Sequence, residues 1–301
     1  MAIDIRTKQF GRHFSHIEAD VRPLSVQERR QRRTAQFAET LFQRTCRVAS
    51  SAGKTIARFG FAGLRGAANC LLRERAIGVS GLPDPASACE HPEGLCGSIT
   101  DATPEGLIEG YARGLQGHAL FGRLTWWSPR VAFATPPQDF VTSPGAQEKI
   151  RGGLLRFSLD RDYDCVLKAC AAAENMPPRL MHLFAGLHDM GFAHCVEVRS
   201  AFGARVAGAW GLALGRVFIT LGAFGAELAE RDAALTMLNR HLAQQGFALN
   251  AALPAIGEAR LGFSPMQRED YFAALIANSG YGRLGRWQLH AGVTEDERLA
   301  A

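Results

Sequence analysis

Residues 187–218 read LHDMGFAHCVEVRSAFGARVAGAWGLALGRVF. Two runs within this stretch, 192–199 and 205–214, are rich in the β-branched, aromatic and small apolar residues that fit a buried pleated surface. The short segment 202–204 between them contains a glycine, which is typical of a tight turn. The stretch therefore predicts an antiparallel β-hairpin.

The residues that follow extend this hairpin into a larger pattern. Residues 216–221 predict a third strand. Residues 230–245 carry apolar side chains at helical spacing and stop before Gly246, which predicts a helix with a glycine cap. Residues 247–253 predict a further strand. The order strand, strand, strand, helix, strand indicates a mixed α+β domain.

The residues before the hairpin predict further helices and a strand. Thr103 precedes Pro104 and Glu105, a combination typical of a helix start, so we expect a helix over 104–115. The other expected elements are a strand at 154–159 and helices at 162–173 and 178–190.

The first eighty residues differ from the rest in charge. They contain fifteen Lys and Arg against six Asp and Glu, a net charge of +9, whereas the whole chain carries +5. We expect one helix over 25–49, a second over 54–78 and a loop at 78–85. Residues 1–80 are therefore predicted to be a basic, mostly helical extension. It could meet RNA, meet an anionic membrane surface, or pack against the domain with its arginines in solvent.

Composition indicates the cell compartment. The chain has 301 residues, is 47% hydrophobic and 21% charged, and shows no apolar run long enough for a membrane span. The start of the chain lacks an apolar signal core, so a cytoplasmic protein is expected. Its seven cysteines form no CxxC pair and are expected to be reduced. Cys89, His91 and Cys96 lack a second ligand pair at zinc spacing, so no metal site is predicted.

Several longer motifs point to a known family. Residues 124–130 read LTWWSPR, and residues 156–171 read RFSLDRDYDCVLKACA. Residues 260–272 read RLGFSPMQREDYF, and 81–114 contain a Pro-rich segment, a glycine-rich turn and a helix ending in GYARG. With the hairpin, these motifs resemble, in order, the leucyl/phenylalanyl-tRNA–protein transferase family.

This resemblance implies a GNAT-like acyltransferase domain at 81–272 and a C-terminal tail at 273–301. It also implies a function. The family moves an aminoacyl group from the 3′ end of a charged tRNA to the amino terminus of a protein, a protein modification that belongs to N-end rule degradation. The implied partners are aminoacyl-tRNA and an acceptor protein or amine, and no cofactor is expected.

The reaction-centre positions that the resemblance assigns hold different residue types here. The aspartate and glutamine of the family's D-x-Q motif correspond to Asn250 and Ala252, and its glutamate corresponds to Leu221. Two family serines correspond to Gly222 and Gly225. Because Leu221 and Ala252 carry no polar group, the catalytic residues are unknown from sequence, and we expect standard leucine or phenylalanine transfer to be very slow.

Other positions keep an aromatic or ring-bearing residue. The tyrosine of the family's AYRRG motif is Tyr111, the tryptophan of its FPW motif corresponds to His118, and a helix tyrosine corresponds to Phe184. A further family tryptophan has no counterpart, because 172–178 is shortened. Candidates for the pocket that takes the tRNA end are Tyr111, His118, Trp126, Trp127, Phe184, Phe218 and Phe224, although core packing explains the tryptophans and phenylalanines too. We expect Asn250, Leu221, Ala252, Tyr111 and Trp127 to share one cleft.

Two functions from different classes remain open. One is an aminoacyltransferase with altered substrate or mechanism. The other is an inactive descendant that binds tRNA or RNA, a protein N-terminus or a membrane surface. An acyl-CoA-dependent acetyltransferase fits less well, because ITLGAFGAELAER at 219–231 has glycines without the spacing that cradles a pyrophosphate.

Overall fold

The computed structural model describes residues 26–77, 81–90, 92–99, 102–120, 122–254, 256–278 and 287. The chain divides into two compact units, residues 1–38 and 39–301. In the first unit, the described residues contain helix α2 (Val26–Gln36). All other elements belong to the second unit. No helix among the described residues is both long and apolar enough to cross a membrane.

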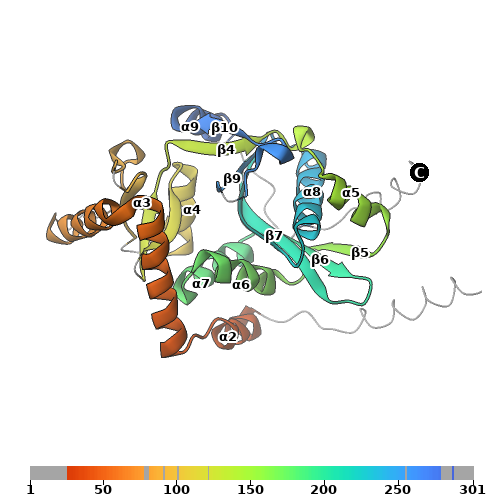
Figure 1. Cartoon of the computed structure of the whole chain (residues 1–301), viewed down its shortest axis with the longest axis horizontal. Coiled ribbons are helices and arrows are strands. Elements are labelled where there is room, and N and C mark those ends of the chain that lie inside the picture. Colours follow the sequence, from red (N-terminus) through yellow and green to blue (C-terminus); the bar gives the residue numbers. More distant parts are fainter. Residues whose placement is uncertain are drawn as a thin grey trace, which may run out of the picture. The chain divides into compact units, whose positions relative to one another are not determined.

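The second unit is organised around a seven-stranded mixed sheet in the described part of the chain (Figure 1). Its strands, in spatial order, are β10 (Ser264–Gln267), β4 (Val131–Thr135), β9 (Leu249–Ala252), β8 (Val217–Gly225), β7 (Arg205–Leu214), β6 (Ala193–Ser200) and β5 (Leu155–Leu159). Only β8 and β9 run parallel, and the other neighbours are antiparallel. Parallel neighbours need a crossover, which α8 (Leu228–Gln244) supplies.

The predicted hairpin and the order of elements after it are confirmed. β6 and β7 pair antiparallel across a turn in which Gly203 has a φ of 85°, a conformation that favours glycine. The series β6, β7, β8, α8, β9 is the expected strand, strand, strand, helix, strand order of a GNAT-like domain. Gly246, with a φ of 75°, follows the end of α8 as predicted.

Helices cover both faces of this sheet (Figure 1). α6 (Tyr163–Glu174) and α7 (Pro178–Asp189) pack on one face, against β6, β7 and β8. α8 packs on the other face, with α5 (Pro144–Arg151) against it. Trp210 of β7 illustrates the first face, because its ring contacts Tyr163 of α6 and Phe184 of α7.

A three-stranded antiparallel sheet, which the sequence analysis did not predict, lies in the N-terminal part of the second unit. Its order is β1 (Leu95–Ser98), β3 (Arg123–Trp127), β2 (Gln116–Leu120). α4 (Pro104–Ala112) packs against β2, and α3 (Leu41–Ile77) packs against β1 and β2. Thr103 caps α4 as expected, accepting a hydrogen bond from the Gly106 amide at 3.0 Å. The remaining helix, α9 (Arg268–Ala277), follows β10.

The prediction of one helix over 25–49 is wrong. α2 ends at Gln36, and α3 begins at Leu41. Thr40 and Gln43 exchange hydrogen bonds, the Thr40 amide donating to the Gln43 side chain at 2.8 Å and the Gln43 amide donating to the Thr40 hydroxyl at 3.2 Å. This reciprocal capping box starts a new helix, which then runs to Ile77 with a non-helical residue at Gly60.

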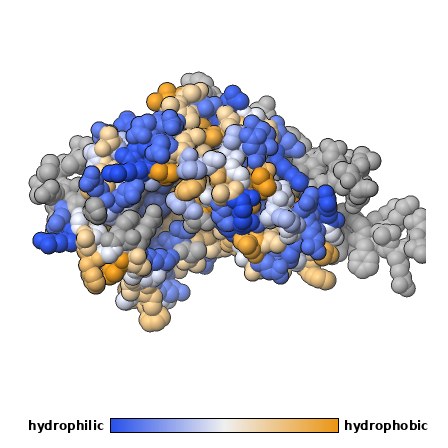
Figure 2. Space-filling model, turned by 45° about the horizontal axis from the view of Figure 1, so that its top comes forward, coloured by the Kyte–Doolittle hydropathy of each residue, from blue (hydrophilic) through white to orange (hydrophobic). Residues whose placement is uncertain are grey.

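Figure 2 shows hydrophilic residues over most of the visible surface, with smaller apolar areas among them.

A buried carboxylate ties the end of β5 to β6 and to the C-terminal segment. Asp160 accepts hydrogen bonds from His194 Nδ1 at 2.7 Å, the Cys195 amide at 2.9 Å and the Trp287 amide at 2.8 Å. Burial acts to raise the pKa of Asp160, but the hydrogen bond and the charge of His194 outweigh it, so the pKa is lowered. The indole of Trp287 stacks on His194 with ring centroids 4.0 Å apart.

We expect Asp160→Asn to lower the free energy of unfolding at neutral pH by about 3 kcal/mol, since an amide cannot accept all three hydrogen bonds. The lowered pKa means that the carboxylate stabilises the fold above the unfolded-state pKa and that this contribution is lost as the pH falls through the folded-state pKa. The difference between variant and wild type should therefore shrink below about pH 4. Urea unfolding of the variant and the wild type, from neutral pH to below about pH 4, measures this difference in the free energy of unfolding.

The control is Glu109→Gln, which removes an exposed ion pair with Arg113 and should cost less than about 1 kcal/mol. Equal unfolding free energies for the two variants would show that the Asp160 network contributes no more than a surface pair.

Candidate functional site

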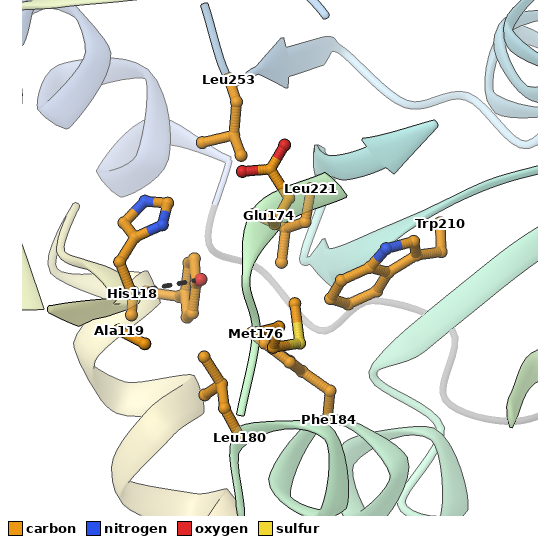
Figure 3. Close-up of a pocket in the computed structure, with 11 residues that line it drawn as sticks. His118, Ala119, Glu174, Met176, Leu180, Phe184, Trp210, Leu221 and Leu253 are labelled. Atoms are coloured by element: carbon orange, nitrogen blue, oxygen red, sulfur yellow. Dashed lines mark hydrogen bonds between the residues drawn. The ribbon is translucent and has the colours of Figure 1, made fainter. Parts of the chain in front are cut away.

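A pocket opens where the small sheet meets the α6 and α7 face of the large sheet (Figure 3). Its lining comes from α4, β2, the end of α6, α7, β7, β8 and the residue after β9. The lining residues are Tyr111, Gly117, His118, Ala119, Glu174, Met176, Leu180, Phe184, Trp210, Leu221 and Leu253. Tyr111, His118, Phe184 and Leu221, which the sequence analysis singled out, thus come together from four separate elements.

Tyr111 holds two parts of the pocket wall in place. Its hydroxyl oxygen accepts a hydrogen bond from the Gly117 amide at 3.1 Å, which fixes the start of β2 against α4. Its ring lies 6.2 Å from that of Phe184 and 6.4 Å from that of Trp126. Burial raises the pKa of Tyr111, so the hydroxyl stays neutral near pH 7. These contacts give Tyr111 a structural role in the wall.

Trp210 fills the floor of the pocket and requires a glycine beneath it. A Cβ atom on Gly222 would lie 2.3 Å from Trp210 Nε1 and 2.9 Å from Cys170 Cβ, both too close for real atoms. A serine, which the family resemblance places at this position, cannot occupy it beside the indole as it stands. The presence of glycine at 222 and the placement of Trp210 therefore depend on each other.

Leu221 owes its orientation to a β-bulge. In the pairing of β7 with β8, Trp210 lies opposite Gly222 and Gly211 lies opposite Thr220, so Leu221 is the extra residue. A bulge redirects a side chain locally. Leu221 is only 4% exposed and lines the pocket, so the position assigned to the family's glutamate does face this cavity.

Asn250 and Ala252 do not share this pocket, contrary to the expectation of one cleft. Asn250 is fully buried on the α8 face, where its Oδ1 accepts a hydrogen bond from Thr220 Oγ1 at 2.8 Å. Its Nδ2 donates to Asn239 Oδ1 of α8 at 2.9 Å. Residues two apart on a strand share a face, so Ala252 points the same way as Asn250. Leu221 instead faces the α6 and α7 side.

The remaining candidates also lie outside the pocket lining. Trp126 is buried beside Tyr111. Trp127 is half-buried, and its Nε1 donates to Thr125 Oγ1 at 2.8 Å. Phe218 is buried with its ring 5.4 Å from that of Trp287, and Phe224 packs over Gly208 at the far end of β8. Packing accounts for the placement of these four aromatic side chains.

Glu174 and Met176 line the pocket but were missed in the sequence. α6 ends with Asn175 in the left-handed conformation, at a φ of 52°, and the amides of Asn175 and Met176 both donate to the carbonyl of Ala171. This C-cap turns the chain sharply, so that residues on either side of Asn175 reach the pocket. They lie in the shortened segment 172–178, where the family motif offers no counterpart.

Glu174 places a carboxylate in an otherwise apolar part of the pocket. Figure 3 draws its carboxyl group beside Leu221 and Leu253. Glu174 is exposed as a whole residue, and partial burial of its carboxyl raises the pKa above the ordinary value, against a smaller lowering by the charge of Lys54 on α3. Among the described residues that line the pocket, Glu174 is the sole carboxylic acid.

The pocket is nearly full. Its free volume is about 20 Å³, enough for a single water molecule. Met176 is half-buried at its edge, and an unbranched side chain of this kind adapts readily to a new neighbour. A leucine or phenylalanine side chain can enter only if such lining residues move.

A larger and more open groove of about 390 Å³ lies on the other face, between α8 and the 3-10 turn Pro137–Asp139. Its polar lining includes Gln138, Thr142, Arg240 and Gln244, and no described lining residue is a carboxylate or an imidazole. This groove therefore lacks a group that could exchange a proton near neutral pH.

Within the described residues, no group of three or more His, Cys, Asp or Glu could hold a metal ion. Burial raises the pKa of Cys96 to about 12, so its thiol stays protonated. His91 lies outside the described residues.

The fold and pocket define an α+β domain of the GNAT-like acyltransferase type with an aromatic-lined pocket over the central strands of its large sheet. The sequence model of the leucyl/phenylalanyl-tRNA protein transferase family matches residues 135–276. A leucyl/phenylalanyl-tRNA–protein transferase of Nitrosospira multiformis is 30% identical over 214 residues, covering 68% of this chain and 92% of that protein. One of Pseudomonas entomophila is 31% identical over 197 residues, covering 63% and 87%. The chain belongs to this family.

Solved structures are less similar. The glucosamine N-acetyltransferase region of a fungal multi-domain β-N-acetylglucosaminidase matches with a TM-score of 0.34 and 11% identity, covering 57% of this chain and 23% of that one.

We predict that Gly222→Ala lowers the free energy of unfolding by about 1–3 kcal/mol, because the added methyl group displaces Trp210 or Cys170. Tryptophan fluorescence should change as well. The control is Gly53→Ala on α3, where a methyl group meets nothing within 4 Å. A Gly222→Ala protein as stable as this control would contradict the packing described for Trp210.

We predict that Asn250→Asp does not restore the family's reaction centre and lowers stability at neutral pH by about 3 kcal/mol. The new carboxylate would have no N–H group to donate to Asn239 Oδ1. It would also carry a buried charge, and burial raises the pKa of a carboxyl group. A group with a raised folded-state pKa loses stabilisation as pH rises, so the deficit should narrow in acid. Unfolding at pH 7 and pH 4 compares the charged and the protonated carboxyl. A stability difference from the wild type that does not depend on pH would contradict the buried placement of residue 250.

Proposed function

We propose that this protein transfers an aminoacyl group from a charged tRNA to an amine acceptor, the amino terminus of a protein being the acceptor class. The aminoacyl end of the tRNA enters the pocket between α4, β2, α7 and β8. Residues 81–272 carry the reaction, residues 1–80 are a basic extension, and 273–301 are a C-terminal tail. A charged-tRNA substrate would place the reaction in the cytoplasm.

The observation that carries this proposal is the convergence on one cavity of residues far apart in the chain. Tyr111, His118, Phe184 and Leu221 come from four elements, and each occupies a position that the family resemblance assigns to the substrate end or reaction centre. Apolar and aromatic walls with few polar groups are typical of sites that bind a small organic moiety. The pocket also holds two groups able to exchange protons, the His118 imidazole and the Glu174 carboxyl.

A second candidate function is binding of charged tRNA without turnover. It is favoured by Leu221 and Ala252, which are apolar, and by the small free volume of the pocket. In this reading, affinity would come largely from phosphate contacts with basic residues of 1–80. On α3, Leu41, Phe42 and Phe61 are exposed beside the basic residues Arg44 and Arg65 and could also meet a membrane surface.

We expect transfer of leucine or phenylalanine to a peptide beginning with Arg or Lys to be at least about 100-fold slower than in a relative that keeps the polar reaction-centre residues, because a missing base or donor commonly costs that much. Mass spectrometry of the peptide after incubation with charged leucyl- and phenylalanyl-tRNA measures it. A transfer rate equal to that of such a relative would contradict the inferred loss of the polar reaction-centre residues.

The proposed activity itself is tested with the full set of charged tRNAs and a panel of amino-terminal peptides. Product from at least one charged tRNA supports transfer. The second function is supported instead if no charged tRNA gives product and if the affinity for charged tRNA falls steeply as the salt concentration rises. Uncharged tRNA is the control that separates recognition of the aminoacyl group from phosphate contacts.

A further inference from the structure

The resemblance leaves the reaction centre without its carboxylate, because the family's glutamate corresponds to Leu221. A carboxyl group nevertheless reaches the same pocket from another element. Glu174, at the last position of α6, lines the cavity together with Leu221 and Leu253. Figure 3 shows its carboxyl group directed toward these two side chains. The chain therefore supplies a carboxylate to the cavity from α6, beside Leu221 of β8.

The geometry of this carboxylate is set by the backbone. Glu174 precedes Asn175, the left-handed C-cap, and the amides of Asn175 and Met176 close the helix on Ala171. The turn places Glu174 and Met176 on the pocket together. No family motif covers this segment, so the feature belongs to this chain's own sequence.

We propose that Glu174 is the catalytic general base of aminoacyl transfer in this protein, in place of the carboxylate absent at Leu221. This assignment rests on the proposed function. Glu174 accepts a proton from the nitrogen of the acceptor amine as that nitrogen attacks the ester of the charged tRNA.

The proposed step conserves atoms and electrons. The lone pair of the acceptor amine attacks the ester carbonyl carbon and forms the new C–N bond. Glu174 takes the proton that leaves the nitrogen. The C–O bond to the ribose then breaks, and Glu174 returns the proton to the ribose oxygen. The products are an amide and a tRNA with a free hydroxyl, and no other reactant is needed.

The groups around Glu174 include one ammonium and three titratable side chains. Partial burial raises the pKa of Glu174, and the charge of the Lys54 ammonium lowers it by less. The other titratable side chains of the lining are Tyr111 on α4 and His118 on β2, and the Cys170 thiol of α6 lies nearby. Burial raises the pKa of both Tyr111 and Cys170, so neither competes as a base near pH 7.

The test compares Glu174→Gln, Glu174→Asp and the control Glu148→Gln, an exposed glutamate of α5, in the full-length protein. The substrate is whichever charged tRNA gives product with the wild type. We expect Glu174→Gln to lower kcat at least about 100-fold with KM for charged tRNA little changed, since a base acts on the chemical step. The wild-type rate should fall on the acidic side of the raised Glu174 pKa, and this limb should vanish in Glu174→Gln.

Glu174→Asp, which keeps a carboxylate, should recover part of the rate together with the acidic limb. A merely structural role would give equal losses in both variants and an unchanged pH profile in each. Full activity of Glu174→Gln, or a retained limb, would overturn the assignment while leaving the transferase function intact.

If the wild type forms no product with any charged tRNA, the proposed function fails and the assignment of Glu174 as its base fails with it. A second measurement then shows whether Glu174 contacts a bound aminoacyl end. A 3′-aminoacylamido-adenosine carries the aminoacyl end through an unreactive amide. Its binding should shift the titration of the Glu174 carboxyl carbon, followed by NMR. Binding with that shift would place Glu174 at the aminoacyl end, and binding without it would show that Glu174 does not contact this end.

Discussion

The pocket depends on the contact between the indole of Trp210 and the backbone at Gly222. Because residue 222 has no Cβ atom, the indole can pack against the backbone of β8, and it contacts the ring of Phe184 with ring centroids 4.7 Å apart. The neighbouring bulge turns Leu221 into the same space. One wall of the site is thus built from a large aromatic ring, a glycine and an irregularity in strand pairing, which together leave little free volume.

The chain belongs to the family and has a GNAT-like fold, and the resemblance assigns its reaction-centre positions to residues of other types. The polar network that remains at Asn250 is turned toward α8, where Thr220 and Asn239 satisfy it. Such a fully bonded amide stabilises the core and is not available to a substrate. The carboxylate that does face the cavity comes from the end of α6. Under the proposal made above, the catalytic carboxylate comes from α6 and not from β8.

Periodicity and turn chemistry were sufficient to predict the hairpin β6–β7, the helix α8 and the cap at Thr103, because each is specified by residues adjacent in the chain. The three-stranded sheet was missed, since its strands are short and two of them, β1 and β2, pack against α3 or α4. The separation of Asn250 from Leu221 could not be read from the sequence either. It follows from the bulge at Leu221 and from strand alternation, which appear only when β7, β8 and β9 are paired. Glu174 was missed because its position depends on a left-handed residue at the end of a helix.

In the proposed function, the aminoacyl end of a charged tRNA occupies this nearly filled pocket. A charged tRNA whose amino acid carries a photoreactive diazirine tests it directly, with cross-linked residues mapped by mass spectrometry. Cross-links are expected at Met176, Phe184 or Leu221, and competition by unlabelled charged tRNA should remove them. Cross-links confined to the groove beside α8, at residues such as Gln138 or Arg240, would contradict it.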